Sequence, residues 1–177
     1  MRPKILLVDD REDNLISIEA ILESGGYQIV KANSGENAIK VLLKEYDFAM
    51  ILMDVRMPQM SGFDTARLIY EREKLRVIPI VFITAYSLNE ENTFHGYQSG
   101  AVDYLLKPIN PEVLRAKVNV LTDLYKKNLL LQEQEQKLIA INKNLEQERN
   151  ERKASEEKVV LLNRRLIEVS TDIRSAL

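Results

Sequence analysis

Five polar residues directly follow short apolar runs along the chain: Asp9, Asp10, Asp54, Thr84 and Lys107. If these runs are parallel strands of one sheet, their carboxyl ends meet at one edge, where ligands of open α/β sheets bind. Three carboxylates brought together would raise one another's pKa values unless a cation neutralised them. Mg²⁺ prefers a few carboxylate oxygens, a carbonyl and several waters, and it leaves positions open for phosphate. The sequence therefore predicts a Mg²⁺ site at this edge.

The same residues suit phosphoryl transfer. An aspartate carboxylate can attack phosphorus as a nucleophile and form an acyl phosphate. A metal ion, the ammonium group of Lys107 and the hydroxyl of Thr84 would then offset the charge on the phosphoryl oxygens. Any single aspartate at a strand end is more simply a helix cap or a solvated loop residue. Only the combination of these residues favours phosphoryl chemistry.

Five apolar runs are predicted as β-strands, and segments of helical period separate them. Their nearly continuous apolar character indicates that both faces of the sheet are covered, as in a parallel sheet between helices. The predicted strands are Ile5–Val8, Gln28–Val30, Met50–Met53, Ile80–Ile83 and Tyr104–Leu106, and the predicted helices between them are Leu15–Ser24, Gly35–Glu45, Phe63–Glu73 and Glu90–Ser99. Five alternating units of this size make a doubly wound α/β domain with a five-stranded parallel sheet.

Residues that commonly begin or end helices agree with this division into elements. Gly25-Gly26 and Gly100 stand where helices should stop. Asn33 with Glu36 is a plausible N-terminal capping pair. Asn110-Pro111 supplies a cap and a first-turn proline for a fifth helix. These signals place the predicted polar residues in loops that follow the strands.

Four short motifs occur in order along the first part of the chain. The loop Asp54-Val55-Arg56-Met57-Pro58-Gln59-Met60-Ser61-Gly62 fits the pattern Asp-x-x-Met-Pro-x-Met-x-Gly, and Val8-Asp9-Asp10, Thr84-Ala85 and Lys107-Pro108 accompany it. With these motifs, residues 1 to about 124 resemble a CheY-like response regulator receiver domain. The resemblance implies a flavodoxin-like sheet of strand order 2-1-3-4-5 and a function in two-component signal transduction.

The resemblance also implies roles at the predicted metal site. Asp54 would accept a phosphoryl group from the histidine of a sensor histidine kinase or a phosphotransfer protein. Asp9 or Asp10, Asp54 and the backbone carbonyl of Arg56 would hold Mg²⁺. On this basis the domain is a phosphoacceptor in signalling and not an enzyme, apart from its own phosphorylation and dephosphorylation.

Three further features follow from the same resemblance. Thr84 and Lys107 would contact the phosphoryl group, and Tyr104 occupies the position of the family's aromatic switch. Lys107-Pro108 is expected to be a cis peptide bond, a form that is tolerated before proline. The alternatives are that Thr84 is only a strand-end hydroxyl and that Tyr104 is ordinary half-buried packing.

The composition of the chain changes near residue 124. All glycines and prolines lie at or before Pro111, and all aromatic residues lie at or before Tyr125. The remainder consists largely of strong helix formers, as expected of a long solvated helix. We therefore predict two parts, a receiver domain over 1–124 and a coiled-coil helix over 125–177.

A heptad pattern runs through this second part. Apolar residues recur every seven positions and are interrupted only by Arg152: Leu124, Leu131, Leu138, Leu145, Val159, Leu166 and Ile173. Their companion core positions are Leu121, Asn128, Glu135 and Asn142 in the first half, whereas Leu162 and Val169 suit a shifted register, so a stutter is predicted near 149–155. Asparagine at core positions favours a parallel two-stranded arrangement. We predict a parallel homodimer, the alternative being a lone helix folded back on its domain.

The last nine residues, Val169 to Leu177, resemble the phosphoacceptor box of dimeric histidine kinases, with Thr171 where that family has histidine. The departure removes the phosphodonor. Two alternatives to a response regulator follow. In the first alternative, the chain is the regulatory N-terminal fragment of a receiver-first histidine kinase. In the second, it is an adaptor protein whose function resides in the coiled coil.

Composition excludes several other classes. The chain of 177 residues has no cysteine, and its only histidine is His95, so neither a thiolate nor a histidine-cluster metal site is predicted. The formal net charge is −2, and basic residues of the tail alternate with glutamates, which does not favour nucleic-acid binding. The N-terminal segment is too short for a signal peptide or a membrane span. We expect a cytoplasmic protein that binds neither nucleic acid nor membrane.

Overall fold

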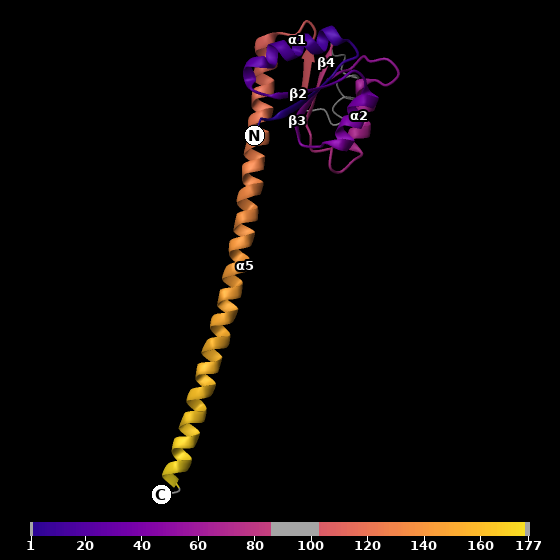
Figure 1. The fold of residues 1–177 in the computed structure, drawn as a ribbon. Coiled ribbons are helices and arrows are strands. Elements are labelled where there is room, and N and C mark those ends of the chain that lie inside the picture. Colours follow the sequence, from indigo (N-terminus) through magenta and orange to yellow (C-terminus); the bar gives the residue numbers. More distant parts are fainter. Residues whose placement is uncertain (1, 86–102, 176–177) are drawn as a thin grey trace. The chain divides into compact units, whose positions relative to one another are not determined.

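The structure is a computed structural model that describes residues 2–85 and 103–175 (Figure 1). Five strands form one sheet: β1 Lys4–Val8, β2 Gln28–Ala32, β3 Phe48–Asp54, β4 Ile80–Thr84 and β5 Asp103–Leu106. The helices are α1 Glu12–Leu22, α2 Gly35–Lys44, α3 Gly62–Tyr70 and α5 Pro111–Ser175, with a short 3₁₀ helix, η1, at Glu23–Gly25. All five predicted strands are present. The predicted helix Glu90–Ser99, with His95 and Gly100, lies outside the described residues.

The strands are parallel and lie in the order β2-β1-β3-β4-β5. This order confirms the predicted doubly wound, flavodoxin-like topology. Parallel strands need crossover connections, and α1, α2 and α3 supply those between β1 and β4; the winding of the sheet reverses between β1 and β3. The site residues at the ends of β1 and β3 therefore lie at the switch point of the sheet.

Two hydrophobic clusters cover the two faces of the sheet, because successive side chains of a strand point to opposite faces. Leu6, Met53 and Phe82 face one cluster, which also contains buried residues of α2 and α3. Leu7 and Leu52 face the other cluster, which contains buried residues of α1 and of the first turns of α5. Both faces are thus buried, which explains why the strands are apolar at nearly every position.

Polar caps fix the starts of α2 and α3. The side chain of Ser34 accepts a hydrogen bond from the backbone N–H of Asn37, 3.2 Å away, and begins α2. The prediction of Asn33 as the cap is therefore wrong by one position. The side-chain oxygen of Asn33 instead accepts a hydrogen bond from the side-chain amide of Asn37. Ser61 caps α3 by accepting from the N–H of Asp64 at 3.1 Å. Both caps stand in loops that follow the site edge of the sheet.

The start of α5 is anchored on the sheet. The side-chain oxygen of Asn110 accepts from the backbone N–H groups of Glu112 and Val113, at 2.9 and 3.3 Å, as a helix cap does. Leu114 and Val118 of α5 are fully buried in the hydrophobic cluster that contains Leu7 and Leu52. The first turns of α5 therefore belong to the packed domain, in agreement with the predicted cap at Asn110.

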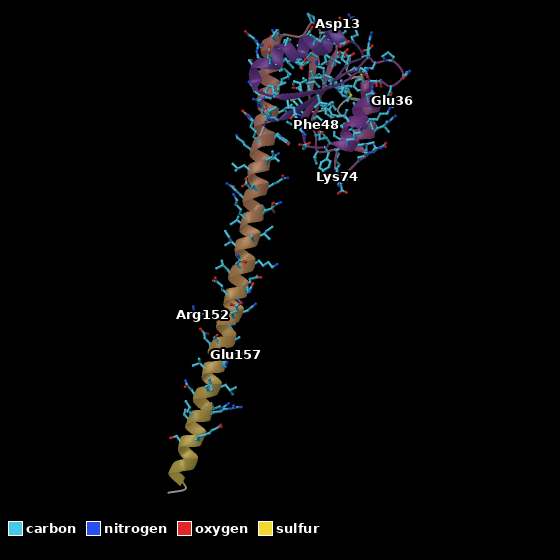
Figure 2. All side chains as sticks on the ribbon, in the orientation of Figure 1. Asp13, Glu36, Phe48, Lys74, Arg152 and Glu157 are labelled. Carbon is cyan, nitrogen blue, oxygen red and sulfur yellow. The ribbon has the colours of Figure 1, made fainter. Side chains whose placement is uncertain are left out.

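The chain divides into two compact units, Met1–Asn128 and Leu129–Leu177. The second unit consists of the later part of α5, whose side chains stand out on all sides of the helix (Figure 2). Large apolar residues of this unit are more than half exposed: Leu130, Leu131, Leu138, Ile139, Ile141, Leu145, Val159, Val160, Leu161, Leu162, Leu166, Ile167 and Val169. None of the helices in residues 2–85 and 103–175 is both long and apolar enough to cross a lipid bilayer.

Candidate functional site

The register of the sheet brings the predicted site residues to one edge. Val8 pairs with Met53, so the residues that follow them, Asp9 and Asp54, come level at the ends of β1 and β3. Asp54 in turn pairs with Ile83, directly before Thr84. The end of β4 lies beside the end of β5, where Thr84 pairs with Leu106 and the next residue is Lys107. These four side chains therefore begin from adjacent points of the sheet edge.

Three carboxylates form a cluster at this edge. Asp9, Asp10 and Asp54 each offer an oxygen, and these oxygens all lie within 4.8 Å of one another. Asp9 and Asp54 are buried, at 1% and 5% exposure, whereas Asp10 is exposed. The predicted acidic cluster is thus present, with one member open to solution.

The ammonium group of Lys107 faces this cluster. Lys107 Nζ lies 3.0 Å from Asp54 Oδ1 and 3.2 Å from Asp9 Oδ2. Three ionised carboxylates carry more negative charge than this one ammonium offsets, and a divalent cation would neutralise the excess. Oxygen ligands of this kind are those that Mg²⁺ prefers. The donor set therefore fits a divalent ion held mainly by Asp9, Asp10 and Asp54.

The backbone around Lys107 fixes its position. Its N–H donates to the carbonyl oxygen of Thr84 at 2.8 Å, which ties the start of the β5–α5 loop to the end of β4. The peptide bond Lys107-Pro108 is cis, as predicted. The ammonium group is thereby aimed at the carboxylates by a loop that is held to the sheet.

The electrostatics of the cluster are strongly coupled. Burial raises the pKa of Asp54, and the negative charges of Asp9 and Asp10 raise it further, while the hydrogen bond and charge of Lys107 act in the opposite direction. Burial acts to lower the pKa of Lys107, but its ion pairs with Asp54 and Asp9 outweigh burial, and the pKa is raised. Lys107 is therefore a cation at neutral pH, and a bound divalent cation would favour the ionised, nucleophilic form of Asp54.

Asn14 is a site residue that sequence reasoning missed. Its side-chain amide donates to both carboxylate oxygens of Asp9, each at 2.9 Å. The backbone N–H of Arg11 also donates to Asp9, at 3.0 Å. These contacts hold the buried carboxylate with its oxygens toward Asp54 and Lys107. The only signal in the sequence was an amide residue in the first turn of the helix that follows the acidic pair.

Thr84, Arg56 and Tyr104 lie around the cluster in different settings. Thr84 is 5% exposed at the end of β4, one residue beyond the pairing partner of Asp54. Arg56 is exposed in the loop two residues after Asp54. Tyr104 is buried in the hydrophobic core, where its ring centroid lies 5.6 Å from that of Phe82. Tyr104 thus packs beneath the site edge and is not itself a member of the carboxylate cluster.

Gly62 closes the loop that follows Asp54. Its N–H donates to the carbonyl oxygen of Val55 at 2.9 Å, so the first turn of α3 returns to the end of β3. A Cβ atom at this position would lie 2.3 Å from the backbone oxygen of Asp54. Only glycine allows this approach of two backbone segments. The glycine of the loop motif therefore sets the position of Asp54.

We predict that Gly62→Ala lowers the free energy of unfolding by about 1–3 kcal/mol, because the added methyl group forces the loop away from Asp54. Urea denaturation measures this change. Gly26→Asn is the matched control, since Gly26 has φ +67° and open space around it, a conformation that asparagine tolerates. A Gly62→Ala protein as stable as the parent would contradict the role given to this contact.

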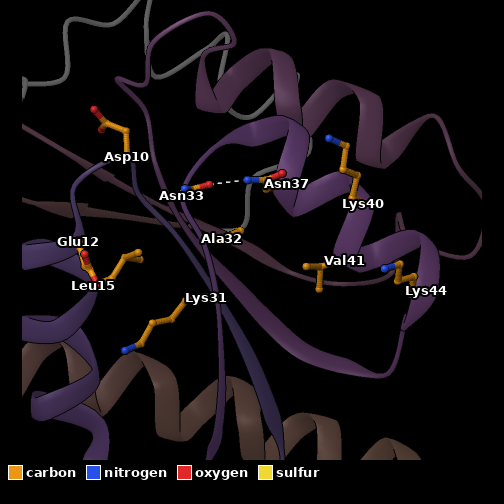
Figure 3. A pocket seen from close by; sticks show the side chains of 10 residues that line it. All are labelled: Asp10, Glu12, Leu15, Lys31, Ala32, Asn33, Asn37, Lys40, Val41 and Lys44. Carbon is orange, nitrogen blue, oxygen red and sulfur yellow. Dashed lines mark hydrogen bonds between the residues drawn. The ribbon is translucent and has the colours of Figure 1, made fainter.

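An open groove of about 690 Å³ adjoins the cluster at Asp10 (Figure 3). It lies between the start of α1, the end of β2 and α2, and its wall on α2 carries Lys40 and Lys44. The side-chain amide of Asn37 donates to the side-chain oxygen of Asn33 in this groove. Asp10 therefore lies on an open groove whose lining is partly polar and partly apolar.

Fold and site together define a receiver domain, a doubly wound parallel sheet with an acidic cluster and a lysine at its carboxyl edge. The chain belongs to the response regulator receiver domain family, whose model matches residues 5–119. It is a module of two-component signalling.

Known proteins similar to this chain agree with the assignment. Response regulator PleD of Caulobacter vibrioides is 38% identical over 122 residues, which are 69% of this chain and 26% of PleD. Protein PilH of Pseudomonas aeruginosa is 32% identical over 116 residues, 66% of this chain and 94% of PilH. The solved structure of chemotaxis response regulator CheY4 of Vibrio cholerae superposes with a TM-score of 0.64 at 29% identity, over 68% of this chain and 99% of CheY4. The chain thus spans about a quarter of the length of PleD.

Proposed function

We propose that Asp54 is the phosphoacceptor of this receiver and that it takes a phosphoryl group from the histidine of a sensor kinase or phosphotransfer protein. The observation that carries the proposal is the position of Asp54, which ends the central strand between two other carboxylates and the ammonium of Lys107. Asp54 has both a carboxylate that can attack phosphorus and a cation within 3.0 Å.

The other site residues have supporting roles in this proposal. Mg²⁺ bound by Asp9, Asp10, Asp54 and the carbonyl of Arg56 would neutralise the attacking and phosphoryl oxygens. Asn14 and the N–H of Arg11 hold the Asp9 carboxylate in place by hydrogen bonds, so Asp9 would be a positioned ligand for the ion.

One ammonium group and one hydroxyl group would complete the phosphoryl site. The ammonium of Lys107, which is paired with Asp54 Oδ1 at 3.0 Å, would pair with a phosphoryl oxygen once Asp54 is phosphorylated. Thr84 would donate its hydroxyl to a second phosphoryl oxygen. Such charge-assisted hydrogen bonds are stronger than those between neutral groups, so both would pull the end of β4 and the β5–α5 loop toward the phosphate.

We further propose that Tyr104 is the aromatic switch. Its side chain is buried against Phe82, in the same strand pair that carries Thr84 and leads into Lys107. A movement of Thr84 toward a phosphoryl group would therefore change the space available to the ring. The protein itself would be a cytoplasmic response regulator, since the kinases that phosphorylate receivers use the ATP of that compartment.

The direct test of the phosphoacceptor function is labelling with acetyl phosphate and Mg²⁺, followed by intact-protein mass spectrometry. We expect one phosphoryl group per chain with Mg²⁺ and none when EDTA replaces it. Labelling that is equally complete in EDTA would contradict the metal-dependent mechanism.

The second part of the proposal concerns the tail. We propose that residues 1–124 act as the receiver and that the helix over 125–177 forms a parallel coiled coil with a second copy of the chain. More than a dozen large apolar side chains of this helix are over half exposed, and such an amount of exposed apolar surface is typical of an interaction site. Phosphorylation would change how the two receivers pack, and the continuous helix would pass that change along the pair.

A single core substitution tests the coiled coil. Arg152 occupies a position of the seven-residue repeat and pairs with Glu156 of its own helix, 3.0 Å away. We predict that Arg152→Leu tightens the homodimer at least about tenfold, because each copy then buries a leucine in the seam. Analytical ultracentrifugation measures the affinity. Lys143→Leu, which lies next to the core position Asn142 on the outer side, is the matched control, and a monomeric parent chain at tens of micromolar would contradict the homodimer.

One second candidate deserves a test. The first curated relatives are longer proteins of which this chain spans about a quarter, so a receiver of this kind also occurs joined to further domains. The weak likeness of Val169–Leu177 to a kinase phosphoacceptor box would then make the chain the front part of a receiver-first histidine kinase. The full gene sequence decides between the two, because a kinase requires an ATP-binding domain after residue 177.

A further inference from the structure

The proposed helix pair contains one segment without apolar core residues. Between Leu145 and Val159 the repeat positions carry Arg149, Arg152 and Glu156. Hydrophobic packing cannot align two helices in this stretch, so charge must decide which partner and which register are accepted. Figure 2 shows the side chains of this segment, with Arg152 labelled, standing away from the helix.

Two charged residues flank the seam at this point. When the first-half register continues as far as Lys153 and the predicted stutter follows at 154–155, Leu145 and Arg152 are d residues and Arg149 is an a residue, so Glu148 is a g residue and Lys153 is an e residue. In a parallel coiled coil the g residue of one helix faces the e residue of its partner five positions further on, and such pairs set orientation and partner choice. Glu148 and Lys153 are five residues apart and of opposite charge. In a pair of identical chains, Glu148 of each copy would therefore face Lys153 of the other copy.

Glu148 and Lys153 both remain available for contacts with a partner helix. Both are exposed, and in the part of the chain that the structure describes neither forms an ion pair, whereas Arg152 pairs with Glu156 and Lys137 with Glu133. Lys153 lies four residues after Arg149, a like-charge spacing that destabilises an isolated helix, and four residues before Glu157, whose opposite charge offsets that effect. A partner chain would give Lys153 a further opposite charge.

We propose that Glu148 and Lys153 of two copies of this chain form reciprocal ion pairs across the parallel helix pair and thereby specify its register and orientation. The inference rests on the proposed homodimer. It assigns the choice of partner to these two residues, and it makes the choice sensitive to ionic strength, since exposed ion pairs are screened by salt.

Charge-exchange variants test this inference in the full chain. In a homodimer, E148K and K153E each replace two attractive contacts by two repulsive ones. We expect the homodimer affinity to fall about three- to tenfold in low salt, because two exposed ion pairs of ordinary strength are lost. The double variant E148K/K153E restores attraction in a parallel pair and should recover the parent affinity. In an antiparallel pair the double exchange restores nothing, because e residues then face e residues.

Mixing the two single variants gives the sharpest readout. Asn142→Cys in each chain supplies its only cysteine. After mixing E148K with K153E and oxidising, heterodimers should exceed the statistical half in low salt and approach it in high salt. A statistical mixture in low salt, with intact homodimers, would overturn the inference alone. A monomeric parent chain would overturn it together with the homodimer, while labelling of Asp54 would be unaffected.

Discussion

Asp54→Asn is expected to abolish phosphorylation by acetyl phosphate and Mg²⁺. Asparagine keeps the size of the side chain and an oxygen for Lys107, but its amide has no anionic oxygen that can attack phosphorus. The two neighbouring carboxylates do not replace it. Asp9 is held by Asn14 and by the N–H of Arg11, and Asp10 is exposed at the rim of the cluster.

Intact-protein mass spectrometry measures the loss. Asp64→Asn is the matched control, because Asp64 is an exposed aspartate of α3 outside the cluster, and this variant should be labelled like the parent. Circular dichroism of both variants shows whether the fold is kept. A phosphate adduct that persists in folded Asp54→Asn would show that another residue is the acceptor.

Combined replacement of Asp9 and Asp10 by alanine has the second large expected effect. The change removes two of the three carboxylates, and the remaining Asp54 is already neutralised by Lys107 at 3.0 Å. The excess of negative charge that attracts a divalent ion is then gone. We expect Mg²⁺ affinity to fall at least about tenfold, because loss of even an outer-shell partner of a bound metal commonly costs that much.

Isothermal titration with Mg²⁺ tests this expectation. Asp13→Ala is the control, since Asp13 pairs with Arg11 on the exposed side of α1 and lies outside the cluster. Unchanged Mg²⁺ affinity in Asp9→Ala/Asp10→Ala would place the metal elsewhere. Loss of affinity in Asp13→Ala as well would point to a general electrostatic effect in place of direct ligation.

The arrangement of the site could be predicted because it depends on strand ends. Asp9 and Asp54 follow uninterrupted apolar runs, and parallel strands bring such ends to the same edge. The register from Val8 to Met53 then places the two carboxylates level. Lys107 could be predicted on the same ground, since it follows β5 directly.

Other features depend on tertiary contacts that no local pattern encodes. Ser34 and Asn33 are both good caps, and only the backbone at the start of α2 decides that Ser34 accepts the hydrogen bond. Asn14 reaches Asp9 because α1 packs with its first turn against the end of β1. The extra residues of β3, from Phe48 to Ala49, were missed because the apolar run begins inside a loop-like sequence with Tyr46 and Asp47.

The measurement that tests the central claim most directly is the chemical location of the phosphoryl group. Borohydride reduces an acyl phosphate to an alcohol and so leaves a permanent mark on the aspartate that carried it. The full chain is phosphorylated with acetyl phosphate and Mg²⁺, reduced, digested and sequenced by tandem mass spectrometry. We predict that the mark falls on Asp54 alone and disappears with EDTA. A mark on Asp9, Asp10 or a tail residue, with Asp54 unmodified, would contradict the assignment of Asp54 as the phosphoacceptor.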